Sequence, residues 1–133
     1  MRIAVEEDDP GARAAIAEML RERHEARAFS CAEEFIEAIH AGETFEAIVA
    51  DAVLPRMSGP DLLRALEAHG LGLTAVIVTG YAPSELDLDG LDVEVQTKPF
   101  PIDDLFAALQ RRAIAWSGSS ASIARDVQSP LPS

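Results

Sequence analysis

The sequence contains few of the features that mark secreted, membrane or nucleic-acid-binding proteins. Cys31 is the only cysteine, which excludes an internal disulfide. No segment approaches the ~20 apolar residues of a membrane span, and the acidic residues 6–9 come too early for a signal peptide. Positive charge is also scarce, since 23 acidic residues against 11 Lys and Arg give a net charge of −12. This charge disfavours nucleic acid and anionic membranes as partners and favours cations or basic protein surfaces. Because neither a signal peptide nor a membrane span is evident, we expect a cytoplasmic protein.

The apolar residues are sufficient for one globular domain. Hydrophobic residues make up 48% of the 133-residue chain and charged residues 26%. Five short apolar runs alternate with amphipathic helical patterns, which predicts an α/β fold with a doubly wound parallel sheet and helices on both faces. We expect residues 1–116 to form this domain. The serine- and proline-containing residues 117–133 are expected to be a flexible tail.

Turn and capping residues place the individual elements. Strands are expected at residues 3–5, 26–29, 47–51, 75–78 and 93–97. Helices are expected to begin after Asp9 and Ser58, and a capping box of Ser30 and Glu33 predicts another. The last helix should run from Ile102 to about Trp116. Residues 83–91 are polar and interrupted by a glycine, so the fourth helix is predicted to be short or frayed.

Asp51 is the leading candidate for chemistry. It ends the apolar run of residues 47–50, so a carboxylate stands where a buried strand leaves the core. Acidic residues 6–9 follow the first strand in the same way, Thr79 follows the fourth and Lys98 the fifth. Because ligands bind at the carboxyl ends of parallel strands, we expect these groups to meet at one edge of the sheet.

Such a group of residues is suited to magnesium-assisted phosphoryl chemistry. Mg²⁺ prefers oxygen ligands and keeps several waters, so two carboxylates and one carbonyl are a sufficient protein share; Mn²⁺ is an acceptable substitute. With the metal bound, a carboxylate such as Asp51 can act as a nucleophile toward phosphorus. Lys98 would offset charge on the phosphoryl oxygens, and Thr79 can donate its hydroxyl.

At these residues the chain resembles the receiver domains of two-component response regulators. The resemblance rests on four segments in the same order and spacing, at residues 5–10, 51–55, 78–82 and 97–100, and it covers residues 2 to about 116. It implies the flavodoxin-like receiver fold with strand order 2-1-3-4-5. The shortened fourth helix is similar to that of receivers found alone or attached to hybrid sensor kinases.

The resemblance also implies a role for each matching residue. Asp8 corresponds to the direct metal ligand, and Glu7 to a residue that acts on the metal through water. Asp51 corresponds to the phosphoacceptor, and the backbone carbonyl of Val53 would complete the metal site. The remaining positions correspond to residues that contact phosphoryl oxygens, Thr79 and Lys98, and to a cis-linked proline, Pro99.

Four positions differ from the usual receiver pattern or could modify it. Glu6 occupies a position that is usually apolar, and we expect it to bend toward solvent rather than to tighten metal dependence or raise a neighbour's pKa. Val95 stands where many receivers have an aromatic switch residue. Tyr81 is a hypothetical substitute that orders the following loop, or simply a partly exposed residue of the pocket. Val53 cannot position an attacking water, which predicts slow hydrolysis of an acyl phosphate.

The expected function is that of a signalling receiver. The resemblance implies that Asp51 accepts a phosphoryl group from the phosphohistidine of a histidine kinase or histidine phosphotransfer protein, and that the changed surface contacts a downstream protein. It implies no enzymatic turnover beyond self-phosphorylation and slow self-dephosphorylation. Two alternatives stay open: a pseudo-receiver that only binds partners, and a Mg²⁺-dependent phosphohydrolase, which Val53 disfavours because such enzymes have an acid there.

Overall fold

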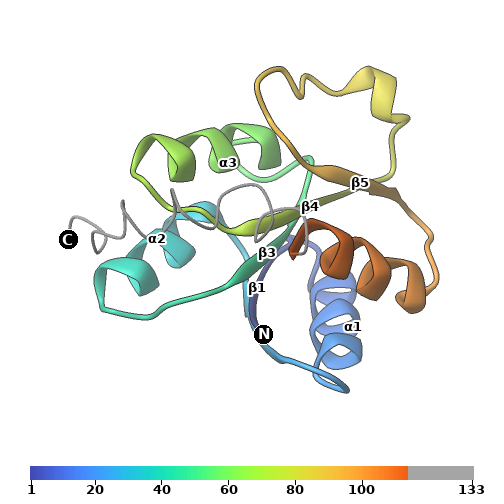
Figure 1. Ribbon diagram of the computed structural model, residues 1–133, viewed down its shortest axis with the longest axis horizontal. Helices are drawn as coiled ribbons and strands as arrows, with labels where there is room; N and C mark the ends of the chain where they lie inside the picture. The colour runs from blue at the N-terminus through green and yellow to red at the C-terminus, as the bar shows by residue number, and fades with distance from the viewer. Residues whose placement is uncertain (114–133) are drawn as a thin grey trace.

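The computed structural model describes residues 1–113 as a five-stranded parallel sheet flanked by helices (Figure 1). The strands lie in the order β2-β1-β3-β4-β5, which confirms the predicted doubly wound topology. Their bounds are Arg2–Glu6 (β1), Glu25–Phe29 (β2), Ala47–Asp51 (β3), Thr74–Thr79 (β4) and Glu94–Thr97 (β5). The carboxyl ends of all five strands therefore lie along one edge of the sheet.

Helices cover both faces of the sheet, because alternate strand residues point to opposite sides. On one face, α1 (Pro10–Leu20) and the last helix, described for residues 102–113, pack on Ile3 and Val5. On the other face, α2 (Ala32–His40) and α3 (Gly59–Ala68) pack on Ala4, Ile48 and Ile77. β3 is buried along its whole length, so its carboxyl end emerges from the centre of the core.

Side chains cap the helices that begin near this edge. The Asp9 carboxylate accepts the Ala12 N–H at 2.8 Å, as predicted. The capping box predicted at the start of α2 is wrong in its acidic member. Glu34, not Glu33, accepts both the N–H and the hydroxyl of Ser30, because α2 begins one residue later than expected, with Cys31 as its N-cap.

The segment between β4 and β5 contains only a short 3₁₀ helix, η1 (Pro83–Glu85), which agrees with the predicted brief fourth helix. Arg64 of α3 holds the chain beyond η1 by donating hydrogen bonds to the carbonyls of Asp87 and Asp89, at 2.9 and 3.0 Å from Nη2. Three leucines of the segment, Leu86, Leu88 and Leu91, pack against the core on the side of α3.

The end of the chain lies outside the described residues. The predictions for Trp116, for a domain boundary at residue 116 and for a flexible tail at 117–133 therefore stay predictions. Within residues 1–113, no helix has the length and apolar character needed to cross a membrane.

Candidate functional site

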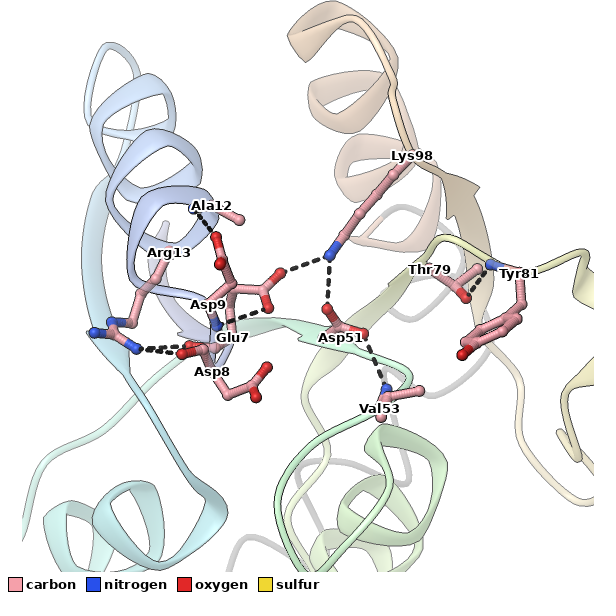
Figure 2. A network of polar contacts seen from close by, with 10 residues as sticks. All are labelled: Glu7, Asp8, Asp9, Ala12, Arg13, Asp51, Val53, Thr79, Tyr81 and Lys98. Atoms are coloured by element: carbon pink, nitrogen blue, oxygen red, sulfur yellow. Dashed lines mark hydrogen bonds and ion pairs between the residues drawn. The ribbon is translucent and has the colours of Figure 1, made fainter.

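The structure brings three of the expected site residues into direct contact at the carboxyl edge of the sheet. Lys98, directly after β5, donates from Nζ to Asp51 Oδ2 at 2.6 Å and to Glu7 Oε1 at 2.7 Å. The three residues come from the ends of β5, β3 and β1, and Figure 2 shows the two carboxylates pointing toward the single ammonium group. Asp51 is 47 positions and Glu7 91 positions before Lys98 in the sequence, yet both carboxylates share its ammonium group.

The site carries more negative than positive charge. Lys98 is the only lysine in the sequence, and it serves two carboxylates that are both buried. Burial raises the pKa of Glu7 and the nearby Asp51 adds to this, although the hydrogen bond from Lys98 acts in the opposite direction. For Lys98, burial alone would lower the pKa, but the two carboxylates outweigh it and raise the pKa. Lys98 is therefore held firmly in its protonated form.

The backbone around Asp51 fixes the orientation of its carboxylate. Oδ1 accepts the N–H of Val53 at 2.9 Å, while Oδ2 takes the bond from Lys98. The next helix begins close behind: a Cβ on Gly59, the first residue of α3, would lie 2.2 Å from the Asp51 carbonyl oxygen. Only glycine allows this approach of α3 to the end of β3.

The oxygen atoms at this edge are chemically suited to Mg²⁺. Asp8 is exposed beside Glu7, and Figure 2 draws no contact to its carboxylate. No group of three or more His, Cys, Asp or Glu side chains within residues 1–113 is arranged to hold a metal. A magnesium ion here would therefore have few protein ligands: the carboxylates of Asp8 and Asp51 and the carbonyl of Val53. Water would supply its other ligands.

Thr79 lies at the end of β4 with its hydroxyl engaged by the following loop. The side chain is fully buried, and Oγ1 accepts the N–H of Tyr81 at 2.9 Å. The Thr79 carbonyl accepts the N–H of Lys98 at 2.7 Å, which ties the threonine to the lysine-bearing strand. Tyr81 itself is 54% exposed.

Glu6 is the site residue whose prediction was wrong. Its side chain does not bend toward solvent: it is fully buried on the α2 and α3 face of the sheet, in register with Phe29 and Ala50. Neither carboxylate oxygen has a hydrogen-bond partner. Burial, with repulsion from Glu34 and Glu33, raises the pKa of Glu6 to about 9, so the group is neutral at neutral pH. The alternation of side chains along a strand explains this burial. Glu6 is two residues after Ala4 in β1, so it points to the same covered face of the sheet as Ala4.

The other two expected modulators lie near Lys98. Val95 is half-buried in β5 and packs against the core on the α3 side of the sheet. The Lys98–Pro99 peptide bond is cis, in agreement with the resemblance.

Two further residues support the site but were not singled out from the sequence. Gly59 permits the close packing on Asp51 described above, and its position in Ser-Gly-Pro at a helix start is the only sequence signal for it. Arg13 of α1 donates from Nη1 to the carbonyls of Glu7 and Asp8. The sequence indicates Arg13 even less clearly than Gly59, because it shows only a single basic residue one helical turn after four acidic ones.

Comparison with known proteins identifies the family. The model of the response regulator receiver domain matches residues 3–110. The chain belongs to this family. It is a response regulator receiver domain, and such domains are the signalling modules of two-component systems.

Individual relatives agree with this assignment. The transcriptional regulatory protein TcrA of Mycobacterium tuberculosis is 30% identical over 122 residues, which cover 89% of this chain but 47% of TcrA. The chain therefore spans about half the length of this relative. A response regulator receiver protein from Sinorhizobium medicae shares the fold, with a TM-score of 0.75, 22% identity and coverage of 86% and 95% of the two chains. The receiver domain of the hybrid histidine kinase CckA also shares it, with a TM-score of 0.68, 24% identity and coverage of 84% and 98%.

Proposed function

We propose that the chain is a phosphoacceptor receiver of a two-component phosphorelay, in which Asp51 takes a phosphoryl group from a phosphohistidine donor. The donor would be a histidine kinase or a histidine phosphotransfer protein, and the output a protein contact in the cytoplasm. Membership of the receiver family and the similarity to the receiver of a hybrid histidine kinase support this class of donor.

One observation carries the proposal more than any other. The Nζ of Lys98 lies 2.6 Å from Asp51 and 2.7 Å from Glu7, so a fixed cation stands beside a buried carboxylate and a second acid. A receiver needs this arrangement, because charge on the transferred phosphoryl oxygens must be offset where the nucleophile attacks.

The transfer itself uses the Asp51 carboxylate. One carboxylate oxygen attacks phosphorus, the bond between phosphorus and the donor histidine nitrogen breaks, and that nitrogen keeps the electron pair. Lys98 would exchange its hydrogen bond with Asp51 for one with a phosphoryl oxygen, and the Thr79 hydroxyl would donate to another. The Val53 N–H, which already holds Asp51 Oδ1, supports the orientation of the nucleophile.

Mg²⁺ would be held by Asp8, Asp51 and the carbonyl of Val53, with Glu7 acting through water. When bound, the metal supplies positive charge that neutralises the acidic edge and the incoming phosphoryl group. The carboxylate of Asp8, which is exposed and has no drawn contact, supports its assignment as a direct ligand.

The signal would leave the site through the loop after β4. The hydroxyl of Thr79 accepts the N–H of Tyr81, so a rotation of Thr79 toward a phosphoryl group would disturb the backbone at Tyr81. Val95 has no ring that could follow this movement. We therefore assign to Tyr81 part of the work of the aromatic residue found at position 95 in many receivers.

Val53 supports the receiver over the phosphohydrolase alternative. Its apolar side chain is 55% exposed beside Asp51, where a hydrolase would have a second acid. The Val53 side chain has no polar group that could activate water, so we expect the acyl phosphate on Asp51 to be long-lived.

The mass of the intact protein after incubation with a small phosphodonor and Mg²⁺ tests the proposal. We expect one stable phosphoryl addition that is absent without Mg²⁺ and absent in Asp51→Asn. Continuous release of phosphate without accumulation would instead indicate the hydrolase. No reaction, with either the small donor or a panel of phosphorylated kinases, would indicate the pseudo-receiver.

A further inference from the structure

Arg13 binds three successive carbonyl groups of the acidic loop that follows β1. Its backbone N–H donates to the Asp9 carbonyl at 2.8 Å. Its side-chain Nη1 donates to the carbonyls of Glu7 and Asp8 at 3.0 and 3.2 Å. A single residue of α1 thus fixes the path of the backbone that carries the acidic pair (Figure 2).

The side chains of this loop are also held, with one exception. The Glu7 carboxylate accepts hydrogen bonds from Lys98 and from the N–H of Asp9, and the Asp9 carboxylate caps α1 through Ala12. Among the hydrogen bonds and ion pairs of residues 1–113, none involves the carboxylate of Asp8. The loop therefore has a fixed backbone and one uncommitted carboxylate.

The choice of partners by Arg13 is unusual for a guanidinium beside four acidic residues. A carboxylate is the stronger partner for arginine, because both groups are charged and can pair through two hydrogen bonds. Arg13 nevertheless takes part in none of the ion pairs within residues 1–113. It binds carbonyl oxygens instead, so its charge lies close to the acidic pair without occupying a carboxylate oxygen.

We propose that Arg13 is a positioning residue of the metal site: it holds the backbone of Glu7 and Asp8 so that the Asp8 carboxylate is presented to Mg²⁺ in a fixed place. The proposal rests on the proposed function, because it requires a metal at the acidic edge. Mg²⁺ demands nearly ideal octahedral geometry, so its affinity depends on where a ligand is fixed as well as on ligand charge. Groups that orient metal ligands typically change affinity by about 10- to 100-fold when removed.

Electrostatics and positioning predict opposite effects for the loss of Arg13. A guanidinium near a cation site repels the cation, so its removal by itself would tighten Mg²⁺ binding slightly. Loss of the carbonyl contacts would instead free the loop and weaken binding. The sign of the change in affinity therefore separates the two roles.

The experiment is calorimetric titration of Mg²⁺ and of Ca²⁺ into the wild type and Arg13→Gln at fixed ionic strength. We expect the dissociation constant for Mg²⁺ to rise about tenfold in Arg13→Gln. The constant for Ca²⁺ should change less, because Ca²⁺ accepts more flexible geometry. Arg23→Gln is the matched control, since it removes the same charge beyond the far end of α1, where Arg23 lies over the ring of Phe106. It should bind Mg²⁺ as the wild type does.

Each other result contradicts a specific statement. If Arg13→Gln binds Mg²⁺ as tightly as the wild type, or more tightly, Arg13 does not position the site, while the proposed function stands. If the wild type binds no Mg²⁺, the proposed function falls and this inference falls with it.

A measurement on the wild type covers the case in which Arg13→Gln does not fold. NMR spectra of the guanidinium group should show Nη signals of Arg13 that are separate and slowly exchanging, with and without Mg²⁺. A single averaged signal in both states would mean that the guanidinium rotates freely, which would rule out the positioning role.

Discussion

Glu6 and Glu7 are adjacent carboxyl groups that the structure places in different surroundings. Glu7 is at the end of β1 and shares Lys98 with Asp51. Glu6 points to the opposite face of the sheet and meets no partner. A buried ionised carboxylate without a partner is costly, so Glu6 keeps its proton and remains a polar group within the apolar layer between the sheet and α2.

We expect the Glu6→Val variant to be more stable than the wild type, and increasingly so as the pH rises. The pKa of Glu6 is raised from 4.5 to about 9 in the folded protein, so the folded state binds this proton more tightly than the unfolded state. The resulting stabilisation is fully present below pH 4.5 and is lost as the pH rises toward 9. Between pH 6 and pH 8 the advantage of Glu6→Val should grow by roughly 3 kcal/mol.

Urea unfolding at several pH values, followed by circular dichroism, measures this advantage. Glu18→Ala is a suitable control because Glu18 is an exposed acid of α1. Its stability should follow the wild type across the same range. Parallel pH curves for Glu6→Val and wild type would show that Glu6 is ionised in the folded protein.

The segment between β4 and β5 is the element in which this chain departs most from a regular alternation of strands and helices. It has the short η1 in place of a full helix, and Arg64 and three leucines attach it to the side of α3. Its first residues are coupled to the site through the hydrogen bond between Thr79 and Tyr81. The segment therefore joins the site to the surface beside α3 without a rigid helix.

We expect phosphorylation of Asp51 to alter this segment through the ring of Tyr81. Amide spectra recorded with and without a beryllofluoride phosphoryl mimic should show shift changes over residues 80–92 in the wild type. The changes should be markedly smaller in Tyr81→Ala, which keeps the backbone N–H that Thr79 accepts but removes the ring.

Tyr81→Phe is the control for this prediction, because it retains the ring and removes only the hydroxyl. Its spectra should respond as the wild type does. Identical responses in all three proteins would mean that the ring is merely a partly exposed side chain and that the signal takes another route.

At the scale of the whole molecule, acidic residues far outnumber basic ones, and the net charge is −12. Ten arginines and one lysine serve 23 acidic residues, and four consecutive acids lie at the end of β1. Such an excess destabilises the compact state through self-repulsion, which salt screens and a bound cation offsets locally. Mg²⁺ should therefore act on the stability of the whole domain as well as on phosphoryl transfer.

We expect MgCl₂ to raise the thermal unfolding midpoint more than NaCl at equal ionic strength. A ligand that binds only the folded state at ten times its dissociation constant adds about 1.4 kcal/mol to the free energy of unfolding. For a domain of this size, that corresponds to a shift of a few degrees. Removal of the metal with a chelator should reverse the shift.

Asp8→Asn separates specific binding from screening. The variant should still respond to NaCl but should lose the additional effect of MgCl₂. Equal midpoints in the two salts for the wild type would argue against a specific magnesium site.

The sequence predicted the elements well where local signals were unambiguous. Asp9 caps α1 as predicted, α3 begins directly after Ser58 as expected, and the interrupted segment at 83–91 forms only η1. The capping box was assigned to Glu33 rather than Glu34, because either spacing fits a helix start and only the backbone path decides which carboxylate reaches Ser30.

The candidate site was predictable as a set of residues but only partly as an arrangement. Strand ends and parallel topology were enough to place Asp51, Glu7 and Lys98 at one edge. The fate of Glu6 was not foreseen, since the sequence shows a charged residue near a strand end but not which layer covers it. Arg13 was missed for a related reason: its partners are backbone carbonyls, which leave no pattern in the side-chain sequence.

By itself, the sequence determined the alternation of strands and helices and the residues available for chemistry, because these follow from the period of apolar residues and from the polar residues at strand ends. The resemblance of those strand-end motifs to receiver domains implied the family and the strand order, and both are confirmed. Tertiary structure decided how those residues are used. Lys98 contacts Glu7 and Asp51, which come from the ends of two other strands, and burial makes Glu6 neutral. Such contacts depend on distances between segments far apart in the chain, and no local pattern encodes them.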